Sequence, residues 1–200
     1  MAGTRSRLIF LIMDILRAFL ENISPLTPIE TKFLLESWEP VSYQKKEIIS
    51  REGAMEKYVY FVLEGIQRAY YLKDDREITI VFTYPPSFCG SIDSLLTSTP
   101  SLYFVETITE SRLLRRNFAE IEELATRHQG INTLLRKATE TALTGVNRKH
   151  YELVALTMEE KFESFYKRSA HLINKIPHKH IASYLGMDPT NFSKILKKFR

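Results

Sequence analysis

Six polar side chains near the C-terminus have the chemical types and spacing that contact with a nucleic acid requires. They lie between His178 and Phe199 and are Thr190, Asn191, Ser193, Lys194, Lys197 and Lys198. Hydroxyl and amide groups bond to base edges, and an ammonium group pairs with phosphate or with guanine, so this set fits an element lying in the major groove of DNA. We expect Thr190, Asn191 and Lys194 to face base edges or nearby phosphates, and Ser193, Lys197, Lys198 and Lys179 to contact phosphates.

Two short helices joined by a tight turn would position these side chains. With Gly186 as the turn, small or apolar residues fall at each buried position of a helix-turn-helix: Ile181, Ala182, Leu185, Met187, Phe192 and Ile195. Gly186 adopts positive φ at little cost, Asp188 caps the second helix, and Pro189 at the first helical position loses no hydrogen bond. An ordinary helical hairpin with a solvated basic end is the alternative.

Positive charge is concentrated at the same end of the chain. The whole chain has a formal net charge of +4. From residue 161 onward there are nine Lys or Arg and two acidic residues, whereas residues 1–160 carry 19 basic and 22 acidic residues. A basic C-terminal module on a mildly acidic body indicates contact with DNA through one end, although a solvated charge run would look similar.

Cysteine content and the N-terminal segment exclude other classes. The only cysteine, Cys89, rules out an intramolecular disulfide, a cysteine-ligated iron–sulfur cluster and a cysteine-rich zinc site, and it fits the reducing cytoplasm, where we expect the protein to act. The apolar run LIFLIM ends at Asp14 and is too short to span a bilayer. We expect an amphipathic helix from about Leu8 to Asn22 and no membrane partner, with Met13 as an alternative start.

The middle of the chain has the pattern of an antiparallel β structure. A short helix over Pro28–Ser37, capped by Thr27, is followed by runs that predict strands at Pro40–Tyr43, Glu47–Arg51, Val59–Glu64, Gln67–Leu72, Glu77–Thr83 and Phe104–Thr109. Such spacing indicates a barrel or double-sheet roll, and helical pattern resumes at about Asn117. The region from Glu39 to Thr109 contains no histidine for a cupin metal site, and the chain has no P-loop or nucleophile elbow. We expect no enzyme, no metal and no cofactor.

A long helix is predicted from Ile131 to Leu156, which contains no proline. Residues at helical spacing along it are Ile131, Leu134, Leu135, Ala138, Ala142, Gly145, Val146 and Leu153. Because several are small, two copies of the helix could approach closely, and we expect this face to form a homodimer seam. Packing of the same face on the barrel of its own chain is the alternative. Asn147–His150 is expected to kink the helix.

The order of barrel, long helix and small helix-turn-helix resembles the Crp–Fnr family of bacterial transcription regulators. The stretch from Lys45 to Leu96 is similar to the family's sensor barrel, with Gly53 and Gly65 at its turn glycines, and Ile176–Ile195 is similar to its helix-turn-helix. The resemblance implies a fold with a cyclic-nucleotide-binding-like roll. It also implies double-stranded DNA and a second copy of the chain as partners. The barrel is then either a degenerate sensor for a small-molecule effector, which the sequence does not identify, or a purely structural module.

Two departures from the family pattern limit what the resemblance implies. Cyclic-nucleotide-binding members carry a Glu for the ribose and an Arg for the phosphate, but here the Glu position is Ser91 and the Arg position falls at Ser101 or Leu102. The degenerate pocket comprises Gly90, Ser91, Ile92, Asp93, Ser101 and Leu102, and we expect it not to bind cyclic AMP because a buried phosphodiester needs a cationic donor. The family usually continues into a β-hairpin wing, whereas this sequence ends at Arg200, so we expect some backbone contacts of a wing to be either missing or supplied by the basic tail.

The sequence therefore predicts an α+β protein: an antiparallel double-stranded jelly roll with flanking helices, a long dimerisation helix and a C-terminal helix-turn-helix. The expected parts are a sensor barrel over 1–130, a connector helix over 131–156 and a DNA-binding domain over 157–200. The predicted function is a homodimeric DNA-binding transcription regulator that does not respond to cyclic AMP. The alternative is a small-molecule sensor whose basic helical end is an interaction module without a specific DNA target.

Overall fold

Alternation along strand β3 (Tyr58–Glu64) organises the first two thirds of the molecule. Val59 and Phe61 point to one face of the strand, Tyr60 and Val62 point to the other, and all four are buried. Because successive side chains of a strand point to opposite faces, β3 has a hydrophobic core on each side. The computed structural model that shows this describes the backbone of residues 2–199 and the side chains of residues 11–199.

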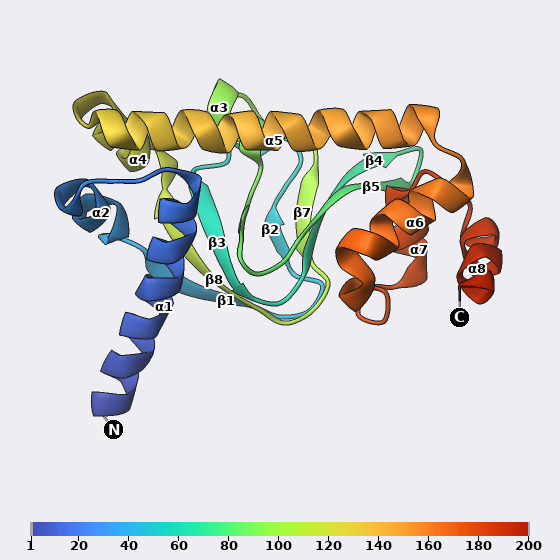
Figure 1. Ribbon diagram of the computed structural model, residues 1–200, viewed down its shortest axis with the longest axis horizontal. Helices are drawn as coiled ribbons and strands as arrows, with labels where there is room; N and C mark the ends of the chain where they lie inside the picture. Colours follow the sequence, from blue (N-terminus) through green and yellow to red (C-terminus); the bar gives the residue numbers. More distant parts are fainter. Residues whose placement is uncertain (1, 200) are drawn as a thin grey trace.

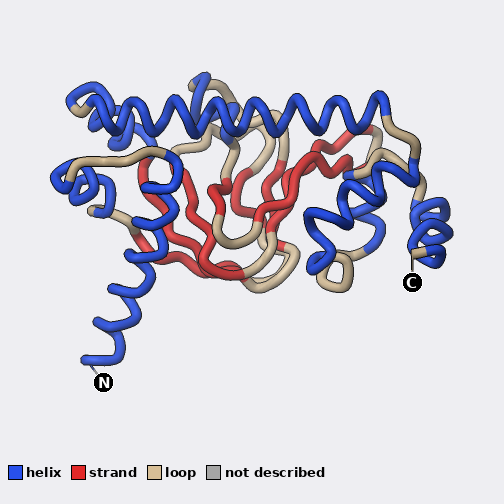
Figure 2. The backbone as a smooth tube through the Cα atoms, viewed as in Figure 1, coloured by secondary structure: helices blue, strands red, loops and turns tan. Residues whose placement is uncertain are grey.

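Within these described residues the strands form two four-stranded antiparallel sheets (Figures 1 and 2). One has the order β1-β8-β3-β6 and the other the order β2-β7-β4-β5. The strand bounds are Glu39–Tyr43 (β1), Ile48–Ser50 (β2), Gln67–Lys73 (β4), Arg76–Thr83 (β5), Ser87–Cys89 (β6), Phe104–Thr107 (β7) and Ser111–Asn117 (β8). This is the strand order of a jelly roll, so the predicted fold class is confirmed.

Helices cover the outer face of the first sheet. They are α1 (Ala2–Ile23), α2 (Pro28–Leu35), α4 (Phe118–Arg127) and the beginning of α5 (Gln129–Ala155). Leu16, Leu34 and Ile131 from these helices pack in one cluster with Phe61 and Leu114 of the sheet. The sheet is therefore buried on both faces. No helix of the described part of the chain is both long enough and apolar enough to cross a membrane.

Helix α5 leaves the barrel and carries the C-terminal helices beyond it (Figure 1). These are α6 (Met158–Ser169), the 3₁₀ turn η1 (Ala170–Leu172), α7 (His178–Tyr184) and α8 (Pro189–Lys198). The chain continues as one helix through Asn147–His150, so the expected kink is wrong. Sharp kinks arise at proline or where the backbone ladder is interrupted, and neither occurs there.

Other elements also differ from the sequence prediction. Strands β6 and β8 and the short helix α3 (Ile92–Thr97) were not predicted, α1 begins at Ala2 rather than near Leu8, and α2 ends at Leu35. The arginines of β8 interrupt the apolar pattern that would have predicted a strand. The strand accommodates them because they are paired, Arg112 with Glu64 and Arg115 with Glu39. Met1 and Arg200, and so the end of the predicted basic tail, lie outside the described residues.

A single carboxylate fixes the start of α5 on the barrel. Glu30 of α2 is buried and accepts hydrogen bonds from the Thr27 backbone N–H at 2.9 Å, the Thr27 hydroxyl at 2.7 Å and the Gly130 N–H at 2.7 Å. The Thr27 bonds, and then that from Gly130, lower the pKa of Glu30. The same side chain thus completes the capping box of α2 and satisfies a free N–H at the beginning of α5.

We predict that Glu30→Ala lowers the free energy of unfolding by about 2 kcal/mol, because donors in a buried region lose their acceptor. Since the pKa of Glu30 is lowered in the folded protein, its contribution is present above its unfolded pKa of about 4.3 and is lost as pH falls through the folded value. Urea unfolding at several pH values measures both effects. Glu122→Ala, on the exposed side of α4, is the control, and equal stability of the two variants would contradict this role.

Candidate nucleic-acid interface

The C-terminal helices form the predicted helix-turn-helix. All six positions predicted to be buried are buried, from Ile181 and Ala182 through to Ile195. Gly186 takes φ +65 at the turn, where an added Cβ would meet Leu153 at 3.1 Å. The Asp188 carboxylate caps α8 by accepting from the Thr190 N–H at 2.7 Å, and Pro189 is the first helical residue. The predicted cap and turn are thus confirmed residue by residue.

The side chains predicted to contact DNA lie on the outside of this unit. Exposed members of the set are Lys179, Thr190, Ser193, Lys194, Lys197 and Lys198, whereas Asn191 is half-buried. Thr190, Lys194 and Lys197 are spaced at i, i+4 and i+7 and so form one stripe along α8. The structure therefore brings the predicted set together on one solvent-facing surface.

Three lysines of this surface, Lys179, Lys194 and Lys197, form no ion pair with another described residue. The Lys198 ammonium, by contrast, lies 3.5 Å from the Glu159 carboxylate of α6. The Ser193 hydroxyl donates to the Pro189 carbonyl of its own helix at 2.9 Å. Lys194 and Lys197 are thus the side chains of α8 best placed to meet an external anion, and Ser193 would have to exchange its bond first.

The predicted dimer seam needs correction. Ile131 and Leu134 are buried in the core of their own chain and Leu135 packs beside them, because the first turns of α5 lie on α4 and on the helices that cover the sheet. Ala138 is half-buried, and the exposed residues of the predicted face are Ala142, Gly145, Val146 and Leu153. The alternative of packing on the chain's own barrel therefore holds for the beginning of α5.

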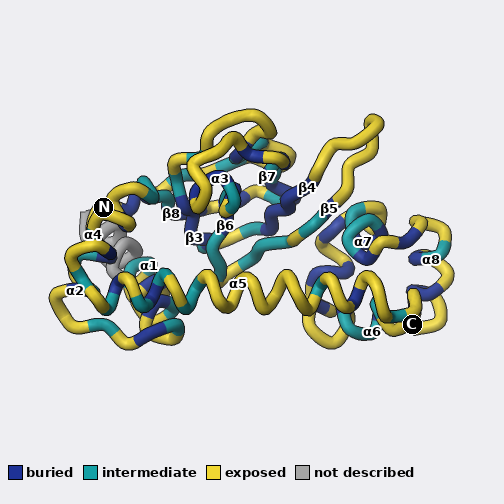
Figure 3. Tube along the Cα trace, turned by 90° about the horizontal axis from the view of Figure 1, so that it is seen from above, coloured by how far each residue is buried: buried dark blue, intermediate teal, exposed yellow. Residues whose placement is uncertain are grey.

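A different stripe of α5 is apolar and exposed. Leu143, Val146 and Val154 are 60%, 64% and 73% exposed. With His150 they follow a spacing of i, i+3, i+7 and i+11, which places them on one side of the helix. This side overlaps the edge of the predicted face, because Val146 lies about 60° around the helix from Ile131. The middle of α5 is exposed along its length (Figure 3). The sequence pattern indicated Val146 but not Leu143 and Val154, because the prediction followed the small residues Ala142 and Gly145 on the neighbouring face.

Two serines of the predicted degenerate pocket are buried and hydrogen-bonded to each other. Ser91 and Ser101 are 0% and 2% exposed, and their hydroxyl oxygens lie 2.6 Å apart. Ser101 also donates to the Tyr103 carbonyl at 2.8 Å, and the Ser91 hydroxyl lies 2.8 Å from the Asp93 carboxylate. None of the ion pairs formed by the described residues involves Asp93. The two positions that would hold a ribose and a phosphate therefore satisfy each other and present no cation.

Other members of the predicted pocket do not converge with these serines. Leu102 is 63% exposed and Ile92 is also exposed. Gly90, at φ +127, passes close to the Tyr58 carbonyl, where a Cβ would lie 3.3 Å away. Of the two predicted arginine positions, only Ser101 faces the cassette. Within residues 11–199 no group of His, Cys, Asp and Glu has the arrangement of a metal site.

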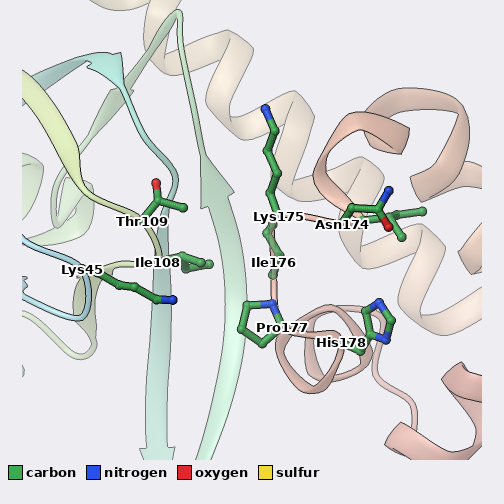
Figure 4. A pocket seen from close by; sticks show the side chains of 9 residues that line it. Lys45, Ile108, Thr109, Asn174, Lys175, Ile176, Pro177 and His178 are labelled. Carbon is green, nitrogen blue, oxygen red and sulfur yellow. The ribbon is translucent and has the colours of Figure 1, made fainter.

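A hollow of about 490 Å³ lies between the barrel and the helix-turn-helix (Figure 4). Lys45, Ile108 and Thr109 line it from the barrel, and Ile173–His178 line it from the turn before α7. Lys45 extends toward Pro177, whereas Lys175 points away from it. The hollow therefore interrupts the contact between the barrel and the helix-turn-helix on this side.

Comparisons with known proteins agree with this architecture. Residues 40–128 match the family model of the cyclic nucleotide-binding domain. FixK2 from Bradyrhizobium japonicum is similar in structure, with a TM-score of 0.73 and 21% identity over 80% of this chain and 83% of that chain. No curated protein matches the sequence.

Two further solved structures share the fold. The catabolite activator protein of Thermus thermophilus has a TM-score of 0.56 at 18% identity, over 88% of this chain and 84% of that one. A proposed transcriptional regulator of the Crp/Fnr family from Eubacterium rectale has a TM-score of 0.69 at 18% identity, over 89% and 87%. At these identities the likeness concerns the fold.

We predict that neither cyclic AMP nor cyclic GMP stabilises this protein, because Ser91 and Ser101 replace the groups that would hold the ribose and the phosphate. A ligand present at a hundred times its Kd would raise the free energy of unfolding by about 2.7 kcal/mol, so binding would be visible in a thermal-shift titration. The expected result is an unchanged melting temperature. Saturable binding in the micromolar range by calorimetry would contradict this account of the pocket.

Proposed function

This chain has the fold of the Crp–Fnr regulators, with a cyclic nucleotide-binding domain over residues 40–128, and on that premise we propose that it is a homodimeric DNA-binding transcription regulator rather than an enzyme. The fold alone supports a transcription regulator. The proposal adds the DNA surface, the dimer and independence from cyclic AMP. Acting on chromosomal DNA, the protein would work in the cytoplasm.

The observation that carries the proposal is the outer surface of α8. It presents hydroxyl and ammonium groups on a helix capped by Asp188 and held by buried Phe192 and Ile195. A capped helix of this length, with its polar side outward and its apolar side on α7, suits entry into a major groove. The proposed base contacts are Thr190, Asn191 and Lys194.

We propose that two copies pair through the exposed stripe of α5, namely Leu143, Val146 and Val154. A solvent-exposed apolar stripe on a long helix is unfavourable for a monomer, and a second α5 would cover it. Parallel pairing about a two-fold axis would put both α8 helices at the same end of the dimer. They could then enter successive major grooves, about 34 Å apart.

Selection of bound sequences from random duplex DNA tests the proposed function. The expected result is an inverted repeat whose half-sites are separated by about one helical turn. A sensor protein with a non-specific basic end would enrich no sequence, and that result would favour the alternative of an interaction module.

We predict different effects for two lysines of α8. Lys194→Ala should weaken specific binding by about 1–3 kcal/mol if Lys194 contacts a guanine edge, and should affect non-specific binding less. Lys197→Ala should weaken both kinds of binding alike and reduce the salt dependence by about one unit, because a phosphate contact releases a counterion whatever the sequence. Titration of the selected and a scrambled duplex at several salt concentrations measures both.

The control for this pair is Lys167→Ala, which removes an exposed lysine of α6 outside the proposed surface. It should leave the affinity for both duplexes within error. If Lys194→Ala and Lys197→Ala behave identically, the surface binds DNA through charge alone and Lys194 does not read sequence.

We predict that Val146→Glu converts the dimer to a monomer at micromolar concentration. Like charges would face each other in the apolar seam, which costs about 3 kcal/mol or more, roughly a hundredfold in the dimer dissociation constant. Because Val146 is 64% exposed in the single chain, the fold itself should remain, as circular dichroism would check. Sedimentation measures the association state. Thr144→Glu, on a neighbouring side of α5, is the control, and a monomeric parent protein would refute the seam.

A further inference from the structure

A buried arginine joins the barrel to the helix-turn-helix. Arg68 of β4 has a side chain only 3% exposed, and its Nη1 lies 2.9 Å from Nδ1 of His180 on α7. Its Nη2 donates to the Glu77 carboxylate of β5 at 2.6 Å and to the Glu106 carboxylate of β7 at 2.7 Å. The carboxylates of β5 and β7 thus fix the planar guanidinium on one side, and Nη1 on its other side is directed at α7.

A second polar contact lies one turn further along α7. The Ser183 hydroxyl accepts from the backbone N–H of Thr79 at 3.0 Å and donates to the Glu77 carbonyl at 3.1 Å. Ser183 thereby satisfies two backbone groups of β5, which is the edge strand of its sheet. The first helix of the helix-turn-helix thus occupies the free edge of the barrel.

Apolar packing supports this contact without fixing its direction. Ile66 and Ile108 at the end of the barrel belong to the same cluster as the helix-turn-helix core, and Phe82 packs beside Tyr184. Apolar contacts are non-directional, and the hollow shown in Figure 4 leaves one side of the junction open. Hydrogen bonds, by contrast, need defined distances and angles. The polar contacts of His180 and Ser183 therefore set how α7 sits on the barrel.

We propose that His180 and Arg68 are positioning residues for DNA binding: their hydrogen bond holds the helix-turn-helix in one orientation on the barrel and so fixes the spacing of the two α8 helices in the dimer. This inference rests on the proposed function and adds a role for the barrel that requires no effector. The barrel acts as a rigid base, and the dimer accepts one half-site spacing because neither helix-turn-helix is free to rotate.

The arrangement positions α8 and does not cover it. Thr190, Lys194 and Lys197 are exposed although α7 is docked, and so is Lys179 at the beginning of α7. The contacts with the barrel come from His180, Ser183 and Tyr184, on the other side of α7. Docking therefore leaves the proposed DNA surface available, and its loss should weaken binding by removing preorganisation.

The protonation state of His180 decides whether the Arg68 bond can form. Arginine only donates, so Nδ1 must accept, and a second proton on the ring would occupy the lone pair that Arg68 uses. Burial, then the charges of Arg68 and Lys179, lower the pKa of His180 to about 4, and Glu77, 4.0 Å away, opposes them. The charged groups around the ring are Arg68 of β4, Glu77 of β5, Glu106 of β7, Lys46 of the β1–β2 turn and Lys179 of α7.

The sign of the pH effect follows from this lowered pKa. A free histidine has a pKa of about 6.5, so docking favours the neutral ring and is complete above that value. As pH falls from about 6.5 toward 4, the population of the undocked state with protonated His180 increases. The equilibrium constant for docking therefore falls about tenfold between about pH 7.5 and about pH 5.5.

The test measures affinity for a panel of duplexes in which the two selected half-sites are moved apart or together by one or two base pairs. The readout is the ratio of Kd for altered spacing to Kd for the selected spacing. His180→Ala should lower this ratio about tenfold, which matches the loss of one hydrogen bond to a charged group. His180→Asn should retain it, because the side-chain amide oxygen can accept from Arg68 without titrating. Asn174→Ala, exposed in the turn before α7, is the control.

The same panel at lower pH separates positioning from general folding. The parent protein should lose spacing discrimination between about pH 7.5 and about pH 5.5, whereas His180→Asn should keep it. Unchanged discrimination in His180→Ala, or equal pH dependence in the parent and His180→Asn, would overturn the inference while leaving the proposed function intact. A parent protein that selects no DNA sequence would instead refute the proposed function itself.

Discussion

Burial of Ile131 and Leu134 at the beginning of α5 is the constraint on which the rest of the architecture depends. These two side chains lie in the core that covers the outer face of the first sheet, and Glu30 bonds the Gly130 N–H next to them. Helix α5 has 27 residues and is continuous, so fixing its first turns on the barrel also fixes the position of its far end. This anchorage places the end of α5, from which the C-terminal helices continue, and it leaves the stripe of Leu143, Val146 and Val154 exposed.

The C-terminal end of α5 has its own anchorage to the helices that follow. Glu152 is buried, pairs with Arg168 and accepts from the Ser164 hydroxyl of α6 at 2.8 Å. Its hydrogen bonds with Arg168 and Ser164 outweigh burial and lower the pKa of the Glu152 carboxyl. Lys149, one turn earlier, lies over the Tyr184 ring at 3.5 Å. The helix-turn-helix is thus held from α5 on one side and from the barrel on the other, which leaves little freedom for α8 to move relative to the rest of the chain.

Sequence reasoning predicted the helix-turn-helix down to its caps because local chemistry determines it. Gly186, Asp188 and Pro189 each have a conformational preference that acts within a few residues, and the structure confirms all three. The jelly-roll class also followed from the short strands. Strand β8 was missed because Arg112, Arg115 and Arg116 form hydrogen bonds with residues distant in the sequence, and such bonds cannot be predicted from a local sequence pattern.

The seam and the barrel junction show where a sequence pattern is insufficient. Ile131, Leu134 and Gly145 share one helical face whatever that face contacts, and only tertiary structure reveals that Ile131 and Leu134 pack on their own chain while Gly145 is exposed. Arg68 and His180 are 112 residues apart, and neither lies in a recognisable motif. Ser91 and Ser101 could be identified as replacements from the family resemblance, but their mutual hydrogen bond required coordinates.

Hydroxyl-radical footprinting of the protein on its selected duplex tests the proposed DNA-binding dimer most directly, since it maps where each α8 lies. The account predicts two protected patches on one side of the duplex, separated by about one helical turn, because two fixed α8 helices enter successive major grooves. A single patch, or uniform weak protection along the duplex, would contradict it.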